Sequence, residues 1–266
     1  MKKAINFWKM SGSGNDFVVI DDRRRAVTNP AAFAKKYCHR KFGVGADGLL
    51  LVEKSKKHDF RMVYFNSDGS RAAFCGNGSR CISLFAYLNG IAPKKMSFES
   101  DAGIIYAEVG HGNTVKVRMP EPKDIRVDFN VDVDGKKYRA SFADTGVPHT
   151  VIFVKDTENV DVAALGRKIR RHRMFAPAGT NVNFVKVLGK HKISVRTYER
   201  GVEDETLACG TGAVASAVIS ILKKFAVSPL SAATRGGEIL RVYYDGKTAY
   251  LEGKVEVTFE GKIVRT

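Results

Sequence analysis

The sequence predicts an α/β protein of the α+β type, built as two similar lobes that each curl a mostly antiparallel sheet around one central helix. Three observations lead to this prediction. Short strand-like runs dominate the chain. The run GTGAVASAVISILKK (210–224) is apolar on every face, as is typical of a helix that other structure surrounds. Two motifs also occur twice in the same order, which indicates an internal duplication.

Several segments have the composition or the alternation of β-strands. The turn SGSGN separates the first two of them, and Asp-Gly pairs at 134–135 and 245–246 predict hairpins. The last of the early runs, TVKVRM, alternates apolar and polar residues, which favours a strand with one buried face. The expected strands of the first half are 5–9, 17–21, 60–65, 104–109 and 114–119.

Helices are fewer. The segment NPAAFAKKYC begins with an Asn N-cap and a proline at the first helical position, and GNGSRCISLFAYLNG ends on a glycine. The prolines of the segment 119–122 separate two strand-forming runs and predict the boundary between the lobes. We therefore expect an N-terminal lobe over 1–120 and a C-terminal lobe over 121–266, with about the last dozen residues able to pack back on the first lobe.

The duplication rests on two pairs of motifs. GSGNDFVVI (12–20) resembles AGTNVNFVKV (178–187), and YFNSDGSRAAFCGNGSR (64–80) resembles TYERGVEDETLACGTGA (197–213). Each half thus carries one asparagine turn and one cysteine at a helix start. This arrangement predicts one thiol per lobe, facing a shared cleft.

The composition limits the classes of function. The 266 residues are 44% hydrophobic and 27% charged, as in a globular protein, and no run approaches the length of a membrane span. The N-terminus lacks a signal-peptide core, so we expect a cytoplasmic protein with reduced thiols. The net charge of +16 would suit nucleic acid, a membrane surface or a small acidic substrate. Because the basic clusters are not interleaved with aromatics, we interpret them as solvated surface and expect no nucleic-acid or membrane partner.

The two Cys-Gly-x-Gly turns contain the candidate catalytic residues. A helix N-terminus offers unpaired N–H groups and the positive end of the helix dipole, so Cys75 and Cys209 are expected to have depressed pKa values. The flanking glycines let the backbone approach a bound anion. Two thiols across one cleft suit inversion at carbon, since one thiolate removes a proton from one face and the other thiol delivers one to the opposite face. The alternative is that each cysteine is a small buried hydrophobe.

The other two cysteines are expected in the core. Cys81 shares a helical face with Leu84, Phe85 and Leu88, and Cys38 follows Ala34 by four residues on an amphipathic helix. A zinc site that used Cys75, Cys81 and His39 is a further alternative. The chain has no closely spaced cysteine pair of the kind that binds zinc, so no metal is expected.

At this point the chain is seen to resemble the diaminopimelate epimerase family, which inverts the L,L isomer of diaminopimelate to the meso form without pyridoxal phosphate. The resemblance covers most of the chain, and the two cysteine motifs are its most specific part. It implies paired α/β lobes with the active site between them, no cofactor, diaminopimelate as the substrate, a role in lysine and peptidoglycan biosynthesis, and a homodimer. The matching motifs are KMSGSGNDFVVID, GVGADGLLLVE, FNSDGSRAAFCGNGSRC, TGVPHTV, AGTNVNFV and TYERGVEDETLACGTGA.

The resemblance also implies roles for individual residues. Cys75 and Cys209 match the two acid–base residues, and His149 and Glu199 match residues that tune the thiols. Glu199 and Arg200 form the family's Glu-Arg pair, in which the guanidinium can grip a carboxylate with two hydrogen bonds. The positions that match substrate contacts are Asn15, Asn66, Gly76, Asn77, Asn181, Glu199, Arg200, Gly210 and Thr211.

Two positions depart from some relatives. Val147 stands where many members have an asparagine that contacts the substrate, and Gly48 stands where others have a glutamine. The resemblance therefore indicates the reaction type more closely than it indicates the contacts to the distal end of the substrate. Two other functions stay open: a proline or hydroxyproline racemase, which also uses two cysteines, and a basic nucleic-acid-binding module, which would explain the charge but leaves the paired turns unaccounted for.

Overall fold

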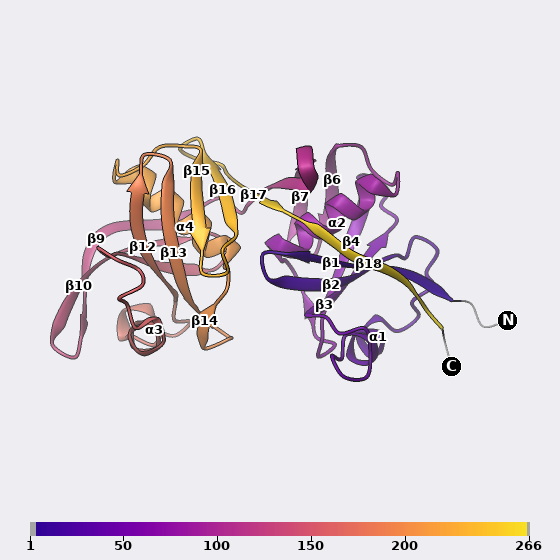
Figure 1. Ribbon diagram of the computed structural model, residues 1–266, viewed down its shortest axis with the longest axis horizontal. Coiled ribbons are helices and arrows are strands. Elements are labelled where there is room, and N and C mark those ends of the chain that lie inside the picture. The colour runs from indigo at the N-terminus through magenta and orange to yellow at the C-terminus, as the bar shows by residue number, and fades with distance from the viewer. Residues whose placement is uncertain (1–3, 265–266) are drawn as a thin grey trace. The chain divides into compact units, whose positions relative to one another are not determined.

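The computed structural model describes residues 4–264, which divide into two units (Figure 1). Among the described residues, unit 1 comprises 4–117 and 253–264, and unit 2 comprises 118–252. The α-helices are α1 (Pro30–Tyr37) and α2 (Gly76–Leu88) in unit 1, and α3 (Val162–Arg170) and α4 (Gly210–Leu222) in unit 2.

Unit 1 is a mixed sheet in which antiparallel pairs outnumber parallel ones. Strands β18, β1 and β2 pair antiparallel, β2 pairs parallel with β3, and β3 pairs antiparallel with β4. Strand β4 pairs antiparallel with the short β5 and parallel with β6, from which β7 and β8 continue antiparallel. The strands are β1 (Ile5–Gly12), β2 (Asn15–Asp21), β3 (Gly48–Glu53), β4 (Phe60–Asn66), β5 (Arg71–Ala72), β6 (Lys95–Ser100), β7 (Gly103–Val109), β8 (Thr114–Arg118) and β18 (Glu256–Ile263).

Unit 2 repeats this succession of pairings. Strands β9, β10 and β11 pair antiparallel, β11 pairs parallel with β12, and β12 pairs antiparallel with β13. Strand β13 then pairs antiparallel with the short β14 and parallel with β15, from which β16 and β17 continue antiparallel. The strands are β9 (Lys123–Val133), β10 (Lys136–Asp144), β11 (Pro148–Phe153), β12 (Asn181–Gly189), β13 (Lys192–Glu199), β14 (Asp204–Thr206), β15 (Leu230–Thr234), β16 (Ile239–Tyr244) and β17 (Ala249–Lys254).

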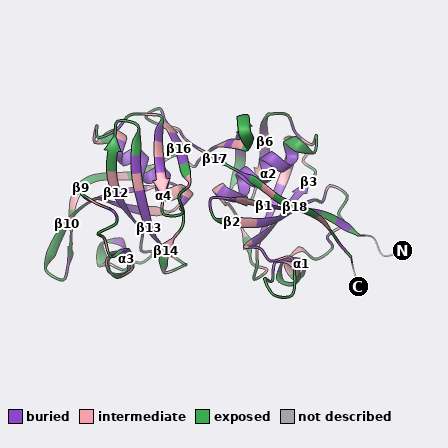
Figure 2. Cartoon of the chain, viewed as in Figure 1, coloured by how far each residue is buried: buried purple, intermediate pink, exposed green. Residues whose placement is uncertain are grey.

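The equivalent helices α2 and α4 are the buried helices of their units (Figure 2). Helix α2 packs on β1, β2, β3 and β7, and α4 packs on strands from β10 to β16. Burial of α4 was predicted from its apolar sequence and is confirmed, since Gly212–Ser220 are all buried. The cysteine before each of these helices has extended backbone angles and serves as the N-cap, so the sheet around the helix fixes where each thiol lies.

The predicted turns and caps are confirmed. Ser13 and Gly14 form the two-residue loop between β1 and β2, and Asp134 and Gly135 form the loop between β9 and β10. All four have positive φ, the conformation that a tight hairpin of matching twist requires. Asn29 caps α1 by accepting a hydrogen bond of 3.1 Å from the backbone N–H of Ala32.

Two of the four cysteines are core residues. Cys81 is fully buried among the apolar side chains of unit 1, and Cys38 is 1% exposed beside α1, as predicted. Burial raises the pKa of the Cys38 thiol to about 12, which keeps it protonated. Within residues 4–264, no helix combines the length and the apolar character that crossing a membrane would take.

Candidate active site

The first candidate site surrounds Cys75 at the start of α2. The side chain is half-buried, and its sulfur accepts a hydrogen bond of 3.3 Å from the backbone N–H of Gly78. The N–H groups of the first helical turn, including those of Gly76 and Asn77, have no partners within the helix and lie at the positive end of its dipole. Negative charge on this sulfur, or on a ligand beside it, is therefore stabilised.

Two predicted substrate contacts lie together beside this turn. The Nδ2 atom of Asn77 donates to Oδ1 of Asn15 over 2.8 Å, and Nδ2 of Asn15 donates to a carboxylate oxygen of Asp47 over 3.0 Å. The hairpin loop at Ser13 and Gly14 places Asn15 at the start of β2. The structure therefore joins segments 12–20 and 64–80 of the sequence at one set of amides.

Asn66 lies at the end of β4, where both the oxygen and the nitrogen of its side-chain amide form hydrogen bonds. Its Oδ1 accepts from the Tyr64 hydroxyl over 2.7 Å, and its Nδ2 donates to Ser70 Oγ over 2.9 Å. Opposite Asn66 on β3 is Gly48, where a Cβ would lie 2.5 Å from the Tyr64 ring. Any side chain at position 48 would therefore require both the Tyr64 ring and the backbone carbonyl of Phe65 to move.

The second candidate site surrounds Cys209 at the start of α4, and here one prediction is wrong. The sequence predicts a depressed pKa, but burial and then the charge of Glu199 raise the pKa of the Cys209 thiol to about 12. The N–H groups of Thr211 and Gly212 and the Thr211 hydroxyl act in the opposite direction without outweighing these two effects. Cys209 is 9% exposed, so desolvation dominates over the helix terminus. It is a protonated thiol at neutral pH.

Glu199 contacts this thiol directly. It lies at the end of β13, and its carboxylate accepts hydrogen bonds from the Cys209 thiol and from Thr206 Oγ1, the latter over 3.0 Å. Burial raises the pKa of Glu199, and the two hydrogen bonds lower it again in part. The carboxylate is thus placed to take the proton of Cys209.

His149 lies behind this pair, fully buried on β11. Asn183 donates to its Nδ1 over 3.1 Å, because the amide oxygen of Asn183 accepts from Thr197 and leaves Nδ2 facing the ring. The remaining proton is therefore on Nε2, which lies 2.9 Å from the hydroxyl oxygen of Thr211. That hydroxyl lies 3.5 Å from the sulfur of Cys209. Burial lowers the pKa of His149 to about 3, with a smaller contribution from Arg200, so the ring is a neutral donor.

The predicted Asn181 and Arg200 also lie together. Asn181 Oδ1 accepts from the backbone N–H of Arg200 over 2.8 Å, and its Nδ2 donates to the carbonyl of Pro148 over 2.9 Å. Arg200 as a whole residue is half-buried, and its Nη1 donates to the carbonyl of Ala178 over 3.1 Å in an exposed bond. That bond uses one of the five N–H donors of the guanidinium. Val147 is half-buried in the β10–β11 turn, two residues before His149.

Four residues in the two sites were not predicted from the sequence. Asn183 follows Asn181 by two residues, so strand periodicity could have placed both side chains on one face of β12. Gly212 is required beside it, since a Cβ there would lie 2.4 Å from Asn183 Oδ1. Asp47 and Arg80 both lie inside quoted motifs, but their partners are distant in the sequence.

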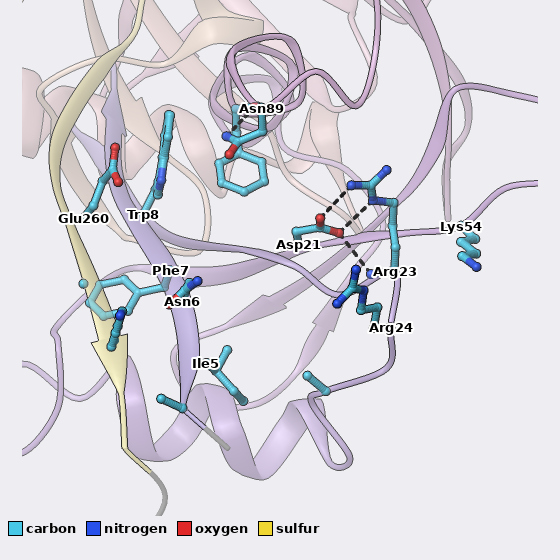
Figure 3. A pocket seen from close by; sticks show the side chains of 15 residues that line it. Ile5, Asn6, Phe7, Trp8, Asp21, Arg23, Arg24, Lys54, Asn89 and Glu260 are labelled. Atoms are coloured by element: carbon cyan, nitrogen blue, oxygen red, sulfur yellow. Dashed lines mark hydrogen bonds and ion pairs between the residues drawn. The ribbon is translucent and has the colours of Figure 1, made fainter. Parts of the chain in front are cut away.

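Two further findings concern other kinds of site. Among residues 4–264, no three His, Cys, Asp or Glu side chains are grouped so as to hold a metal ion. A polar pocket of about 870 Å³ lies in unit 1 near Trp8, and its lining includes none of the predicted site residues. In this pocket Arg23 forms two side-chain hydrogen bonds of 2.8 Å with Asp21 (Figure 3).

The fold is shared with solved structures of low sequence similarity. A phenazine biosynthesis protein of the PhzF family from Bacillus anthracis superposes with a TM-score of 0.75 at 15% identity, covering 99% of this chain and 100% of that one. A hydroxyproline epimerase from Agrobacterium vitis gives 0.69 at 15% identity, covering 99% and 94%. The fold class is therefore that of this group of proteins, a mixed α/β architecture, and in this chain it presents two cysteines at helix starts.

The sequence relatives identify the family within this class. The family model for diaminopimelate epimerase matches residues 7–125 and 141–258. The diaminopimelate epimerase of Aquifex aeolicus is 47% identical, with 97% of this chain and 98% of the relative covered. That of Archaeoglobus fulgidus is 46% identical, with 97% and 95% covered. The chain belongs to the diaminopimelate epimerase family.

Proposed function

We propose that this chain epimerises L,L-2,6-diaminopimelate to meso-diaminopimelate, as an isomerase of lysine and peptidoglycan precursor biosynthesis. The observation that carries the proposal is the pair of cysteines at equivalent places in the two units. Each is the N-cap of the buried helix that follows the short antiparallel strand, and each belongs to a motif of the matched family.

The two thiols differ in a way that assigns their roles. In the forward direction Cys75 acts as the thiolate, because the Gly78 N–H and the α2 terminus stabilise charge on its sulfur. It takes the α-proton, and the electron pair stays on the α-carbon. Cys209 is the acid, because burial keeps its proton in place. It delivers that proton to the opposite face of the same carbon, which inverts the centre and leaves Cys209 as the thiolate.

Glu199 and Thr211 serve the second thiol. The carboxylate of Glu199 accepts a hydrogen bond from the thiol, so it takes that proton when the reaction runs from the meso isomer. The Thr211 hydroxyl, which accepts from His149 Nε2–H, turns its own hydrogen toward the sulfur and stabilises the thiolate. His149 therefore acts through Thr211 as a positioning residue.

Binding of the substrate is assigned to the remaining predicted residues. Arg200 holds a carboxylate through two parallel hydrogen bonds, and the backbone N–H groups at the starts of α2 and α4 hold anionic oxygens. An amino-acid α-proton is weakly acidic, so these donors must act on the developing carbanion with water excluded. The side-chain amides of Asn15, Asn66, Asn77 and Asn181 complete the set, and Gly76 and Gly210 supply backbone N–H groups.

The setting of the reaction is also proposed. The four cysteines are present as thiols, and a mechanism that uses two of them requires a reducing compartment, for which we propose the cytosol. We further propose a homodimer. This proposal rests on the resemblance to the family, and Phe259 on β18, which is 46% accessible, offers an exposed apolar position at which to test it. Sedimentation of the wild type and of Phe259→Lys would test this.

The function is tested by incubating the purified chain with L,L-diaminopimelate and separating the stereoisomers by chiral chromatography. Proline and trans-4-hydroxyproline are assayed beside it. Conversion to the meso isomer without racemisation of proline is expected, whereas activity on proline alone would overturn the proposal. A salt titration of nucleic-acid binding tests the non-enzymatic alternative, because phosphate-driven binding weakens steeply with salt.

A further inference from the structure

The guanidinium of Arg80 is buried inside unit 1, one turn into α2. Its side chain is the largest among those that are fully buried. One nitrogen, Nη2, donates to Oδ1 of Asn77 over 2.8 Å and also donates to Oγ of Ser13 in the β1–β2 loop. Burying a guanidinium is costly, and apolar residues of similar volume often stabilise a core equally well. Stability alone therefore does not explain a guanidinium at this position.

The contact with Asn77 is the first link of a chain of hydrogen bonds. Asn77 Nδ2 donates to Asn15 Oδ1, and Asn15 Nδ2 donates to Asp47 Oδ2. The far end is held in turn, since Arg40 donates to the other carboxylate oxygen of Asp47 over 2.7 Å. The chain thus runs from one buried cation through two amides to one carboxylate.

The two ends determine the direction of every bond between them. A guanidinium can only donate and an ionised carboxylate can only accept. Asn77 must therefore turn its oxygen to Arg80 and its nitrogen to Asn15, and Asn15 must turn its nitrogen to Asp47. An amide flip at either residue would bring two donors or two acceptors together.

We infer that Arg80 is a positioning residue that fixes the orientation of the Asn77 and Asn15 amides, so that both present N–H donors to an anionic group of the substrate. Each amide nitrogen carries two hydrogens, and the chain of bonds uses one of each. The second hydrogens recognise a carboxylate on the Cys75 side of the substrate. This inference rests on the proposed function, since it takes the two asparagines as substrate contacts.

A double-mutant cycle tests the inference. Arg80→Met and Arg80→Lys are compared with the wild type, alone and combined with Asn77→Ala, for kcat and KM on L,L-diaminopimelate. Losing a charge-assisted contact should lower kcat/KM roughly ten- to a hundred-fold, mostly through KM. In the Asn77→Ala background the same change should cost less than about two-fold, because Arg80 acts through Asn77. Equal losses in both backgrounds, or no loss in folded Arg80→Met, would overturn the inference.

Ser13→Ala is the matched control, because it removes a different partner of Arg80 and leaves the amide chain intact. Because Ser13→Ala removes only the hydroxyl and leaves the backbone of the loop in place, it should lower the melting temperature without changing KM. If Arg80→Met does not fold, the cycle is measured with Arg80→Lys, Asn77→Ala and their combination.

A readout without turnover separates the inference from the proposed function. In spectra of the ¹⁵N-asparagine-labelled protein, the side-chain amide hydrogens of Asn77 should exchange slowly in the wild type and rapidly in Arg80→Lys. Unchanged exchange would overturn the inference even in an active enzyme. If the wild type were inactive but its Asn77 side-chain amide exchanged more slowly than that of Arg80→Lys, only the proposed function would be overturned.

Discussion

The Nε2 atom of His149 lies 2.9 Å from the hydroxyl oxygen of Thr211. Because Asn183 faces the other ring nitrogen, the ring is neutral and donates to this hydroxyl. The hydroxyl in turn lies beside the sulfur of Cys209. We therefore expect the histidine to support the second thiol without exchanging a proton with the substrate.

Replacing His149 should therefore weaken the reaction without removing a titrating base. We expect His149→Gln to lower kcat about three- to ten-fold, the usual effect of one lost neutral hydrogen bond. The pH profile of kcat/KM should keep its shape, because His149 is uncharged throughout. If the wild-type profile of kcat/KM instead showed a titration near pH 6.5 that is absent in His149→Gln, His149 would be a general base.

The same histidine should make the folded state sensitive to acid. Its folded pKa is about 3, against 6.5 as the ordinary value, so between these pH values the unfolded chain binds one more proton. The stability contributed by His149 is present above pH 6.5 and is lost as the pH falls toward 3, by up to ~1.4 kcal/mol per pH unit. Urea unfolding between pH 7 and 4 should show a smaller dependence of the unfolding free energy on pH in His149→Gln than in the exposed control His191→Gln.

Glu199 should act on Cys209 in two ways. Removing its charge in Glu199→Gln should lower the pKa of Cys209, because that charge is the second cause of the upward shift after burial. Turnover of the meso isomer should nevertheless fall roughly a hundred-fold or more, since the acceptor of the Cys209 proton is gone. Alkylation of the Cys209 peptide as a function of pH measures the first effect, with the exposed Glu158→Gln as control. An unchanged alkylation midpoint would contradict the proximity of the two groups.

Arg200 should not be replaceable by lysine. A guanidinium forms two parallel hydrogen bonds to a carboxylate, whereas an ammonium has no fixed fork. Losing one such contact costs about 1.5–3 kcal/mol, so kcat/KM of Arg200→Lys should fall roughly ten- to a hundred-fold. The measurement is the steady-state kinetics of the wild type and Arg200→Lys, with Arg139→Lys on the exposed surface as the matched control. Nearly unchanged kinetics would assign Arg200 to the surface.

The three cysteines near the two helix starts should respond differently. Cys75→Ala and Cys209→Ala should each abolish epimerisation, because each removes one of two required proton carriers. Cys81→Ala should retain turnover and lose about 1–2 kcal/mol of unfolding free energy, since Cys81 is packed in the core. Substantial activity in either of the first two variants would end the two-base account.

Local features of this fold could be predicted because their causes are local. The Ser13–Gly14 hairpin, the Asn29 cap and the apolar α4 each follow from a few neighbouring residues. Helix α3 was not predicted, because the basic run 167–173 that overlaps its end was interpreted only as charged surface. Its apolar side, which includes Val162 and Ile169, packs into the core of unit 2.

The chemistry of the sites could be predicted only in part, and the reason is again distance along the chain. The two Cys-Gly-x-Gly turns predicted that Cys75 and Cys209 lie at helix starts, which is confirmed. The pKa of Cys209 was predicted in the wrong direction, because its burial and its contact with Glu199 arise only when β13 and α4 pack together. The bond from Arg80 to Ser13 spans 67 positions in the sequence, so no local pattern could reveal it.

The central claim is that two thiols divide the proton transfers, and deuterium incorporation tests it most directly. L,L-diaminopimelate is incubated with the wild type in heavy water, and substrate and product are recovered at low conversion. The account predicts one deuterium at the inverted α-carbon of the meso product and no label in the recovered substrate, because one thiol removes the proton and the other delivers deuterium. Product that retains the original protium at that carbon would show a single shuttling base and would contradict the account.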